Sequence, residues 1–252
     1  MKNSVGVYLT SLFLLSSCYT ANLLQTAKPI EVGEHEITAG LMYNSLNHDA
    51  EYQGEIFPGA VVMYRTGIFQ NADFGLTYSP SLALGDFRAD MKYNFYKNPV
   101  ESIYLSSLVS LEFNQPLSFD KEFWAFSSGL GLISSFNHQN RFNPFVYQKL
   151  AFGLNDTRAL SLYNSVQTFD ENLHYSHFLH YVGGAGFKHR LKQDGRMHFI
   201  LDFSYFIQRN TIFTNFEVFQ GDDLVFQANS RQKQTRNYQF SLSLAFELRK
   251  KN

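Results

Sequence analysis

An alternation of apolar and polar residues near the end of the chain constrains the fold more than any other sequence feature. One face of this segment consists of Tyr238, Phe240, Leu242, Leu244, Phe246 and Leu248, and the other of Gln239, Ser241, Ser243, Ala245 and Glu247. Successive side chains of a β-strand point to opposite faces, whereas a helix repeats every ~3.6 residues. A tilted strand of this length can also cross a membrane. The segment therefore predicts a long strand with one apolar face.

Two further segments, Phe87–Phe95 and Met197–Gln208, show the same alternation. The apolar faces of all three segments carry no charge. A charged side chain that faces the middle of a bilayer costs about 2–4 kcal/mol, so a lipid-facing wall would be free of charge. The core face of a soluble sheet would be free of charge as well, and the alternation alone leaves both interpretations open.

Eleven segments in total are candidate strands. The weaker ones are 36–46, 60–68, 73–79, 102–113, 123–134, 145–154, 158–168 and 178–191. Turn signals such as Gln70-Asn71, Asn98-Pro99, Asn155-Asp156 and Gln193-Asp194-Gly195 lie between several of them. A barrel with both termini on one side needs an even number of strands. We therefore expect about twelve strands, with ten as the alternative, and with 134–144 and 214–228 as the uncertain regions.

Three features favour a membrane barrel, which has its apolar face outward, over a soluble barrel, which has its apolar face inward. Several strands are long, short and long connections roughly alternate, and aromatic residues gather near strand ends. Phe and Tyr are also abundant, with 26 and 15 copies. The fold class that we predict is all-β, an antiparallel transmembrane β-barrel.

Charged residues on the polar faces of the strands would point into the lumen of such a barrel. They are Arg65, Arg88, Asp90, Lys92, Glu112, Lys188, Asp202 and Glu247. Both signs are present, so these side chains could pair with one another and fill a narrow interior. We expect a closed or narrow lumen, with a selective pore as the alternative.

The N-terminus carries a targeting pattern. Lys2 precedes an apolar run, Val5–Leu15, that is too short to cross a bilayer as a helix. The run ends in Leu15-Ser16-Ser17-Cys18, which resembles the lipobox of bacterial lipoproteins, and Cys18 is the only cysteine of the chain. The resemblance implies a signal peptide at 1–17 and a lipid on Cys18.

The same resemblance implies the order of the domains. Residues 18–33 would form a lipidated periplasmic tether, and residues 34–252 the barrel, which resembles small outer-membrane barrel proteins of the Bacteroidota type. Tyr19 stands where an inner-membrane retention signal would have Asp, and no acidic cluster follows. The expected location is the outer membrane, with the N-terminus lipidated on the periplasmic side.

Little in the sequence points to catalysis or to metal binding. His174, His177 and His180 would lie on one side of a helix, but in a strand His177 faces away from the other two. No nucleophile elbow or phosphate loop is present, and Gly183-Gly184-Ala185-Gly186 lies inside a strand pattern. We predict no catalytic residue, no metal and no cofactor.

The expected function is therefore that of a lipid-anchored outer-membrane barrel with a structural or accessory role, in contact with membrane lipid and with envelope protein partners. The alternatives are a small-solute channel and a soluble β-rich lipoprotein that binds an apolar ligand. The formal net charge of −1 argues against nucleic acid as a partner.

Overall fold

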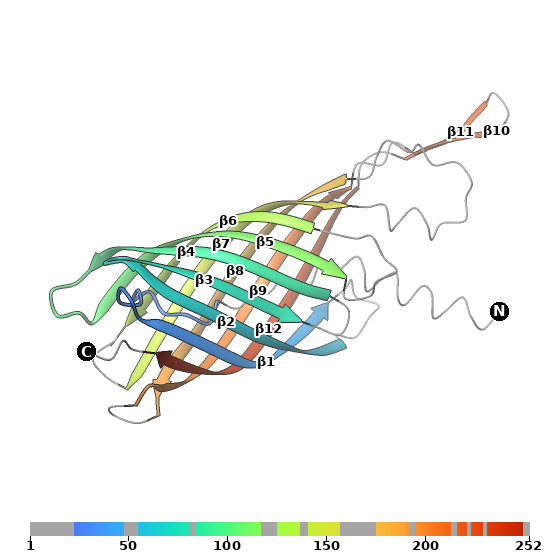
Figure 1. Ribbon diagram of the computed structural model, residues 1–252. Coiled ribbons are helices and arrows are strands. Elements are labelled where there is room, and N and C mark those ends of the chain that lie inside the picture. The colour runs from blue at the N-terminus through green and yellow to red at the C-terminus, as the bar shows by residue number, and fades with distance from the viewer. Residues whose placement is uncertain are drawn as a thin grey trace.

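The computed structural model describes residues 23–47, 55–80, 84–116, 125–136, 141–156, 175–191, 195–212, 216–220, 223–228 and 231–248 of the chain. The predicted signal peptide and Cys18 lie outside these residues, as does the candidate strand 158–168. The described chain after residue 34 is almost entirely β-structure (Figure 1).

Ten strands form a closed antiparallel barrel, and two more form a separate hairpin. Around the barrel the order is β1, β12, β9, β8, β7, β6, β5, β4, β3 and β2, and the pairing of β1 with β12 closes it. The strands are β1 (His35–Asn47), β2 (Glu55–Phe69), β3 (Ala72–Pro80), β4 (Leu84–Lys97), β5 (Ile103–Pro116), β6 (Ala125–Phe136), β7 (Phe142–Asp156), β8 (Tyr175–Arg190), β9 (Met197–Ile212), β10 (Phe216–Gln220), β11 (Asp223–Ala228) and β12 (Arg231–Leu248).

The expectation of twelve barrel strands is wrong, and the alternative of ten is confirmed. The region 214–228 contains the β10–β11 hairpin, whose strands pair only with each other, outside the barrel wall. The region 134–144 contributes no strand of its own, because β6 continues to Phe136 and β7 begins at Phe142. Alternation indicates that a segment is a strand, but it does not indicate with which other strand that segment pairs.

The connections differ between the two ends of the barrel (Figure 1). At the short-turn end lie the connections 70–71, 98–102, 137–141 and 191–196, together with the start of β1 and the end of β12. At the long-loop end lie the connections 48–54, 81–83, 117–124 and 157–174 and the segment that carries β10–β11. The turn expected at Asn155-Asp156 is absent, because these residues belong to the end of β7.

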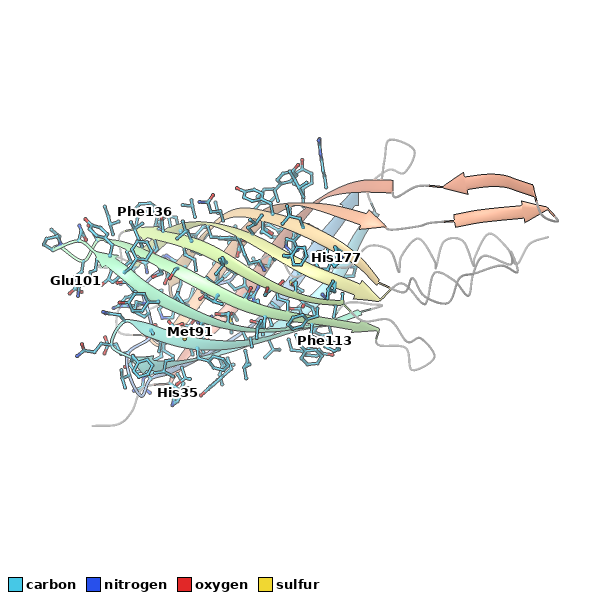
Figure 2. The ribbon with its side chains drawn as sticks, turned by 90° about the horizontal axis from the view of Figure 1, so that it is seen from above. His35, Met91, Glu101, Phe113, Phe136 and His177 are labelled. Carbon is cyan, nitrogen blue, oxygen red and sulfur yellow. The ribbon has the colours of Figure 1, made fainter. Side chains whose placement is uncertain are left out.

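The two faces of the wall have opposite chemistry. On β12, Leu242 is 41% exposed and points outward, whereas the neighbouring Ser241 is fully buried and points inward. The other strands repeat this arrangement, and Met91, Phe113 and Phe136 lie on the outer surface in Figure 2. The apolar face is therefore the outer face. Among the described residues no helix is long and apolar enough to cross a membrane.

Candidate functional site

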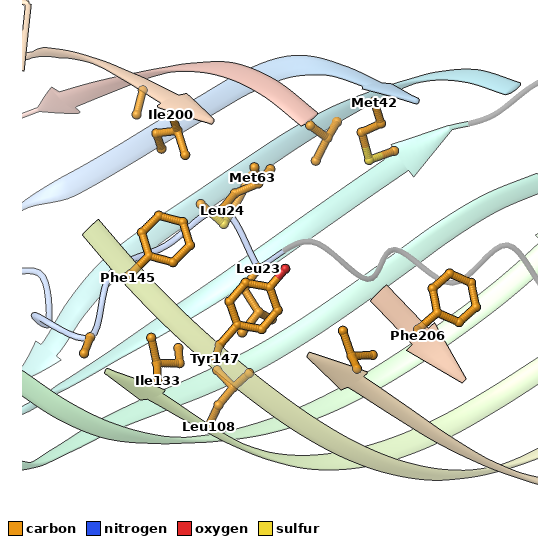
Figure 3. Close-up of a cluster of buried hydrophobic side chains, with 14 of the residues drawn as sticks. Leu23, Leu24, Met42, Met63, Leu108, Ile133, Phe145, Tyr147, Ile200 and Phe206 are labelled. Atoms are coloured by element: carbon orange, nitrogen blue, oxygen red, sulfur yellow. The ribbon is translucent and has the colours of Figure 1, made fainter. Parts of the chain in front are cut away.

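The lumen is occupied by the chain that precedes β1. Leu23–Ile30, which we call the inner segment, lies inside the barrel, and its residues Leu23–Ala27 are buried (Figure 3). Three of its backbone N–H groups donate to wall side chains: Leu24 to Asp202 Oδ2 at 3.0 Å, Ala27 to Ser135 Oγ at 3.0 Å and Ile30 to Asp73 Oδ2 at 2.9 Å. The predicted tether thus contains a stretch that packs within the barrel.

The carbonyl groups of the inner segment are also hydrogen-bonded to the wall. The ammonium group of Lys92 donates to the carbonyl oxygens of Thr26 and Lys28, at 2.8 and 3.0 Å. Ser106 Oγ donates to the carbonyl of Ala27 at 2.5 Å. A buried irregular backbone needs such partners, because each unpaired polar group costs about as much as a lost hydrogen bond. The polar wall supplies them.

The chain between the inner segment and β1 meets the wall at the short-turn end. Gly33, with a φ of +80°, donates its N–H to the carbonyl of Gly67 at the end of β2, and Gly67 donates to the carbonyl of Glu34. A Cβ atom on Gly67 would lie 2.1 Å from the carbonyl oxygen of Glu31, so only glycine permits this close approach. This contact fixes where the chain passes from β1 into the lumen.

A cluster of apolar side chains surrounds Leu23 and Leu24 inside the barrel (Figure 3). Its wall members include Met42, Met63, Leu108, Ile133, Phe145, Tyr147, Val182 and Ile200. The hydroxyl of Tyr147 donates to Asp202 at 2.9 Å, beside the N–H of Leu24. β7 places the apolar residues Phe145 and Tyr147 on its inner face, because they contact this cluster, while Val146, Leu150 and Phe152 of the same strand lie on the outer surface.

Leu24 has a φ of +55°, which is uncommon for a residue with a large side chain. A left-handed conformation of an L-residue costs roughly 1–2 kcal/mol. The burial of the Leu24 side chain and its hydrogen bond to Asp202 offset this cost. The inner segment is thus held in place against local backbone strain.

A first charge cluster links β2, β3 and β4 beneath the inner segment. Arg65 contacts Asp73, and its Nη1 lies 2.6 Å from Asp90 Oδ1. Lys92 Nζ lies 3.1 Å from Asp73 Oδ2, and Arg88 Nε lies 3.5 Å from Asp90 Oδ2. All five side chains are almost fully buried. Opposite charges taken out of water at this depth need such mutual contacts, because the desolvation cost of each ion is several kcal/mol.

Two smaller groups of charges lie elsewhere in the lumen. Lys149 pairs with Glu112, which also accepts from the hydroxyls of Ser110 and Ser127 at 3.1 and 3.3 Å. At the short-turn end Lys188 pairs with Glu36 and lies 3.9 Å from Glu247, whose Oε1 is 2.6 Å from His198 Nε2. The first group joins β7 to β5, which are separated by β6 in the barrel. The second group joins β8, β9, β12 and β1.

The structure places all eight predicted charges on the inner face. Arg65, Arg88, Asp90 and Lys92 share the first charge cluster, Glu112 pairs with Lys149, Lys188 and Glu247 lie at the short-turn end, and Asp202 contacts the inner segment. They do not form a single site.

Sequence reasoning missed four partners of these charges, which are Glu36, Asp73, Lys149 and His198. Alternation could have found Glu36 and Asp73, each of which stands next to an outward apolar residue. It could not have found Lys149, because the neighbouring inward residues Tyr147 and Ala151 are apolar and the outward Gln148 beside it is polar.

A polar cavity of about 100 Å³ remains at the short-turn end. Its lining includes Lys28, Glu31, Lys188, Arg190 and Glu247. At about 30 Å³ per molecule, it has room for roughly three waters. Its lining comes from the inner segment, the residues just before β1, and the ends of the neighbouring strands, so the cavity is a vestibule and does not run through the barrel.

Several charged side chains that point into the lumen are buried. Arg65, Lys149 and Asp202 expose 1% or less of their surface, although all three point inward from different sides of the wall. Residues that line an aqueous pore would be accessible to water, as in the large barrels that conduct solutes. Among the described residues, charge pairs, the apolar cluster and the inner segment lie in the interior.

The histidine motif does not converge. His177 lies on the outer face, where its ring stacks on Phe152 with centroids 5.7 Å apart, and His180 is buried on the inner face. His174 is outside the described residues. Within the part of the chain that the structure describes, no group of three His, Cys, Asp or Glu residues could hold a metal ion.

No family model matches this sequence, and no curated protein does. Solved structures do. The outer membrane protease OmpT from Escherichia coli is 7% identical over 88% of this chain and 100% of that chain, with a TM-score of 0.43. The outer membrane protein OprG from Pseudomonas aeruginosa is 12% identical over 90% of this chain and 100% of that chain, with a TM-score of 0.41.

The translocator domain of the autotransporter NalP from Neisseria meningitidis is 10% identical over 97% of each chain, with a TM-score of 0.40. All three TM-scores are below 0.5. The functional assignment of this protein therefore depends on the chemistry of the inner and outer faces of its own barrel wall. The described residues form an antiparallel closed barrel of ten strands.

Proposed function

We propose that this protein is a bacterial outer-membrane barrel that is sealed by its own inner segment, with a structural or accessory role in the envelope. The observation that carries the proposal is the filled lumen: the residues Leu23–Ala27 are buried inside the barrel and hydrogen-bonded to its wall.

The outer surface supports a membrane location. Large apolar side chains such as Leu130, Phe152 and Leu242 are between 41% and 68% exposed, while the charges within the wall, such as Arg65 and Lys149, are inside. This arrangement is costly in water and stable in a bilayer, where every backbone group of a closed barrel is also paired. The same observation disfavours a soluble barrel that binds an apolar ligand, whose apolar face would have to point inward.

The filled lumen disfavours a solute channel. A path through the barrel would require the inner segment to leave the lumen, with the loss of its hydrogen bonds to Asp73, Ser135 and Asp202. A sealed barrel acts through its surfaces, which is why we assign a structural or accessory role.

A lipid on Cys18 is part of the proposal. Leu23 is five positions after Cys18, and a fully extended chain over that distance spans at most about 18 Å. Both membrane surfaces are within that reach of the middle of the barrel, and we propose the periplasmic side. Because a transmembrane barrel does not need a lipid for retention, the anchor would serve sorting, assembly or docking to envelope partners.

Single-channel recording in planar bilayers tests the sealed lumen. The intact protein should show no stable open state near neutral pH. A variant without the residues 23–30 but with Cys18 retained should conduct ions, and a control variant that lacks the β10–β11 hairpin should stay closed. Heat-dependent gel mobility checks that each variant is folded. A reproducible open state of the intact protein would refute the proposal.

Fractionation of cells tests the location and the anchor. The Cys18→Ala variant should remain in the outer-membrane fraction, whereas mass spectrometry of the wild type should find an acylated N-terminal Cys18. Release of the variant into the soluble fraction would exclude a transmembrane barrel. An unmodified Cys18 would exclude the lipid and leave the barrel intact.

A further inference from the structure

The outer face of β12 changes from apolar to basic at the long-loop end. Its outward residues from Leu248 to Tyr238 are apolar and exposed, and the next outward residue is Arg236, which is exposed as well. At roughly 3.3 Å per residue and a tilt of about 40°, Tyr238 stands about 25 Å above Leu248, which is the height of the apolar band in such barrels. Arg236 lies about 5 Å beyond that band, at the level of lipid headgroups.

Two more basic residues continue this level on the neighbouring strands. On β9, Arg209 comes two positions after Ile207, the cross-strand partner of Arg236. On β8, His177 comes two positions before Leu179, the cross-strand partner of Arg209. His177 is exposed on the outer face (Figure 2). Diagonal positions of this kind are about 7–8 Å apart on one face of a sheet, within reach of long side chains. Each residue is nearly the same number of positions from the short-turn end of its strand, so the three lie at one height. We call Arg236, Arg209 and His177 the basic row.

The level directly beneath the basic row is apolar. It consists of Tyr238, Ile207 and Leu179, one residue from each of the same three strands. Tyr238 and Leu179 are 45% and 43% exposed, and the ring of Tyr238 contacts that of Tyr205, with centroids 5.0 Å apart. Aromatic rings at the edge of an apolar band are typical of the lipid–water interface. The basic row thus borders lipid on one side and water on the other.

The opposite side of the long-loop end lacks such a row. On β4, β5 and β6 the outward residues at the end of the apolar band are Phe87, Phe113 and Phe126. Within the described parts of these strands, no basic residue follows on the outer face. The acidic residue nearest to the basic row in the strand register is Asp156 of β7, which lies diagonal to His177 and away from the arginines. Positive charge is therefore concentrated at the two arginines.

We propose that the basic row binds the phosphate groups of a phosphorylated lipid in the leaflet at the long-loop end, while the acyl chains of that lipid lie on the apolar level beneath. Guanidinium groups donate paired hydrogen bonds to phosphate oxygens, so arginines on adjacent strands can hold a phosphate from two sides. A free anion would gain only the charge contacts, whereas a lipid also covers the apolar level. The inference rests on the proposed function in one respect, that the barrel crosses the outer membrane, and it does not depend on a sealed lumen.

Native mass spectrometry of the purified full chain in detergent measures the binding, with lipid A as the probe and dephosphorylated lipid A, which has the same acyl chains, for comparison. Arg236→Gln and Arg209→Gln should each weaken the binding of lipid A by about fivefold, and the double variant by about thirtyfold, because each basic residue contributes separately near a charged membrane surface. Arg236→Lys keeps the charge and should retain most of the binding. Arg196→Gln, the same exchange at an exposed arginine of the short-turn end, should have no effect.

Heat-dependent gel mobility shows for each variant whether the barrel is folded. A folded wild type that binds both forms of lipid A equally, or a folded double variant that binds like the wild type, would overturn the inference and leave the proposed function intact. Displacement of lipid A by an equimolar amount of inorganic phosphate would show that the arginines hold a free anion, and the lipid would be the wrong occupant. A wild type that forms no folded barrel in detergent would refute the proposed function and this inference together.

Discussion

Removal of the carboxylate of Glu112 should destabilise the barrel by about 4 kcal/mol, because it leaves the ammonium group of Lys149 buried without a counter-charge. The side chain of Lys149 is fully buried, and that of Glu112 is 2% exposed. Within the described residues Glu112 is the only ion-pair partner of Lys149. Breaking one side of such a pair costs about 3–5 kcal/mol.

The arrangement around Arg65 gives a contrast. Removal of Asp73 would still leave Arg65 with Asp90 at 2.6 Å, and Lys92 would keep two carbonyl acceptors. The loss of folding stability for Arg65 and for Lys92 should therefore be smaller than the loss for Lys149. The contrast separates a buried charge that loses its only counter-ion from one that has a second.

The assay is urea unfolding in lipid vesicles, followed by the fluorescence of the single tryptophan and by gel mobility. Glu112→Leu and Lys149→Met should each be strongly destabilised, and the double variant should lose less stability than either, because it removes both charges together. If the losses of the two single variants add in the double variant, the pair is not buried as described and the reasoning fails.

Three further changes test separate parts of the structure. Leu24→Gly should lose about 1 kcal/mol less stability than Leu24→Ala, because only glycine adopts a φ of +55° without strain, and the same urea titration measures this. Gly67→Ala should loosen the inner segment, since its Cβ would lie 2.1 Å from the carbonyl oxygen of Glu31, and hydrogen exchange of residues 23–30 should become faster. At the β4–β5 turn, the hydrogen bond from Lys97 lowers the pKa of the Glu101 carboxyl below 4.5. The stability that this pair contributes should therefore be present at neutral pH and lost as the pH falls through the lowered pKa. NMR titration of the Glu101 carboxyl should give a midpoint below 4.5.

The strands of the barrel were largely predictable because one physical constraint acts on each of them. A wall between lipid and a polar interior forces alternation, which is clearest in β12 and β4. The same constraint gave the inward direction of the predicted charges. The number of barrel strands was not predictable, because the sequence of 216–228 does not reveal that β10 and β11 pair only with each other.

The inner segment could not be predicted from a local pattern. Leu23–Ile30 has no period, since each of its residues meets a different part of a closed interior. Its position depends on the space left by side chains from the ten strands of the barrel. The only signal was indirect: inward apolar residues such as Phe145 and Tyr147, which a lumen filled by charge pairs alone would not need. Lys149 was missed for the same reason, because it lies among them.

Hydrogen–deuterium exchange of the residues 23–30 in the intact protein tests the central claim most directly. The N–H groups of Leu24, Ala27 and Ile30 donate to wall side chains, so we predict that they exchange as slowly as the amides of β12. Exchange of all three within seconds, as in a free tether, would show that the inner segment does not occupy the lumen, and the sealed barrel would be wrong.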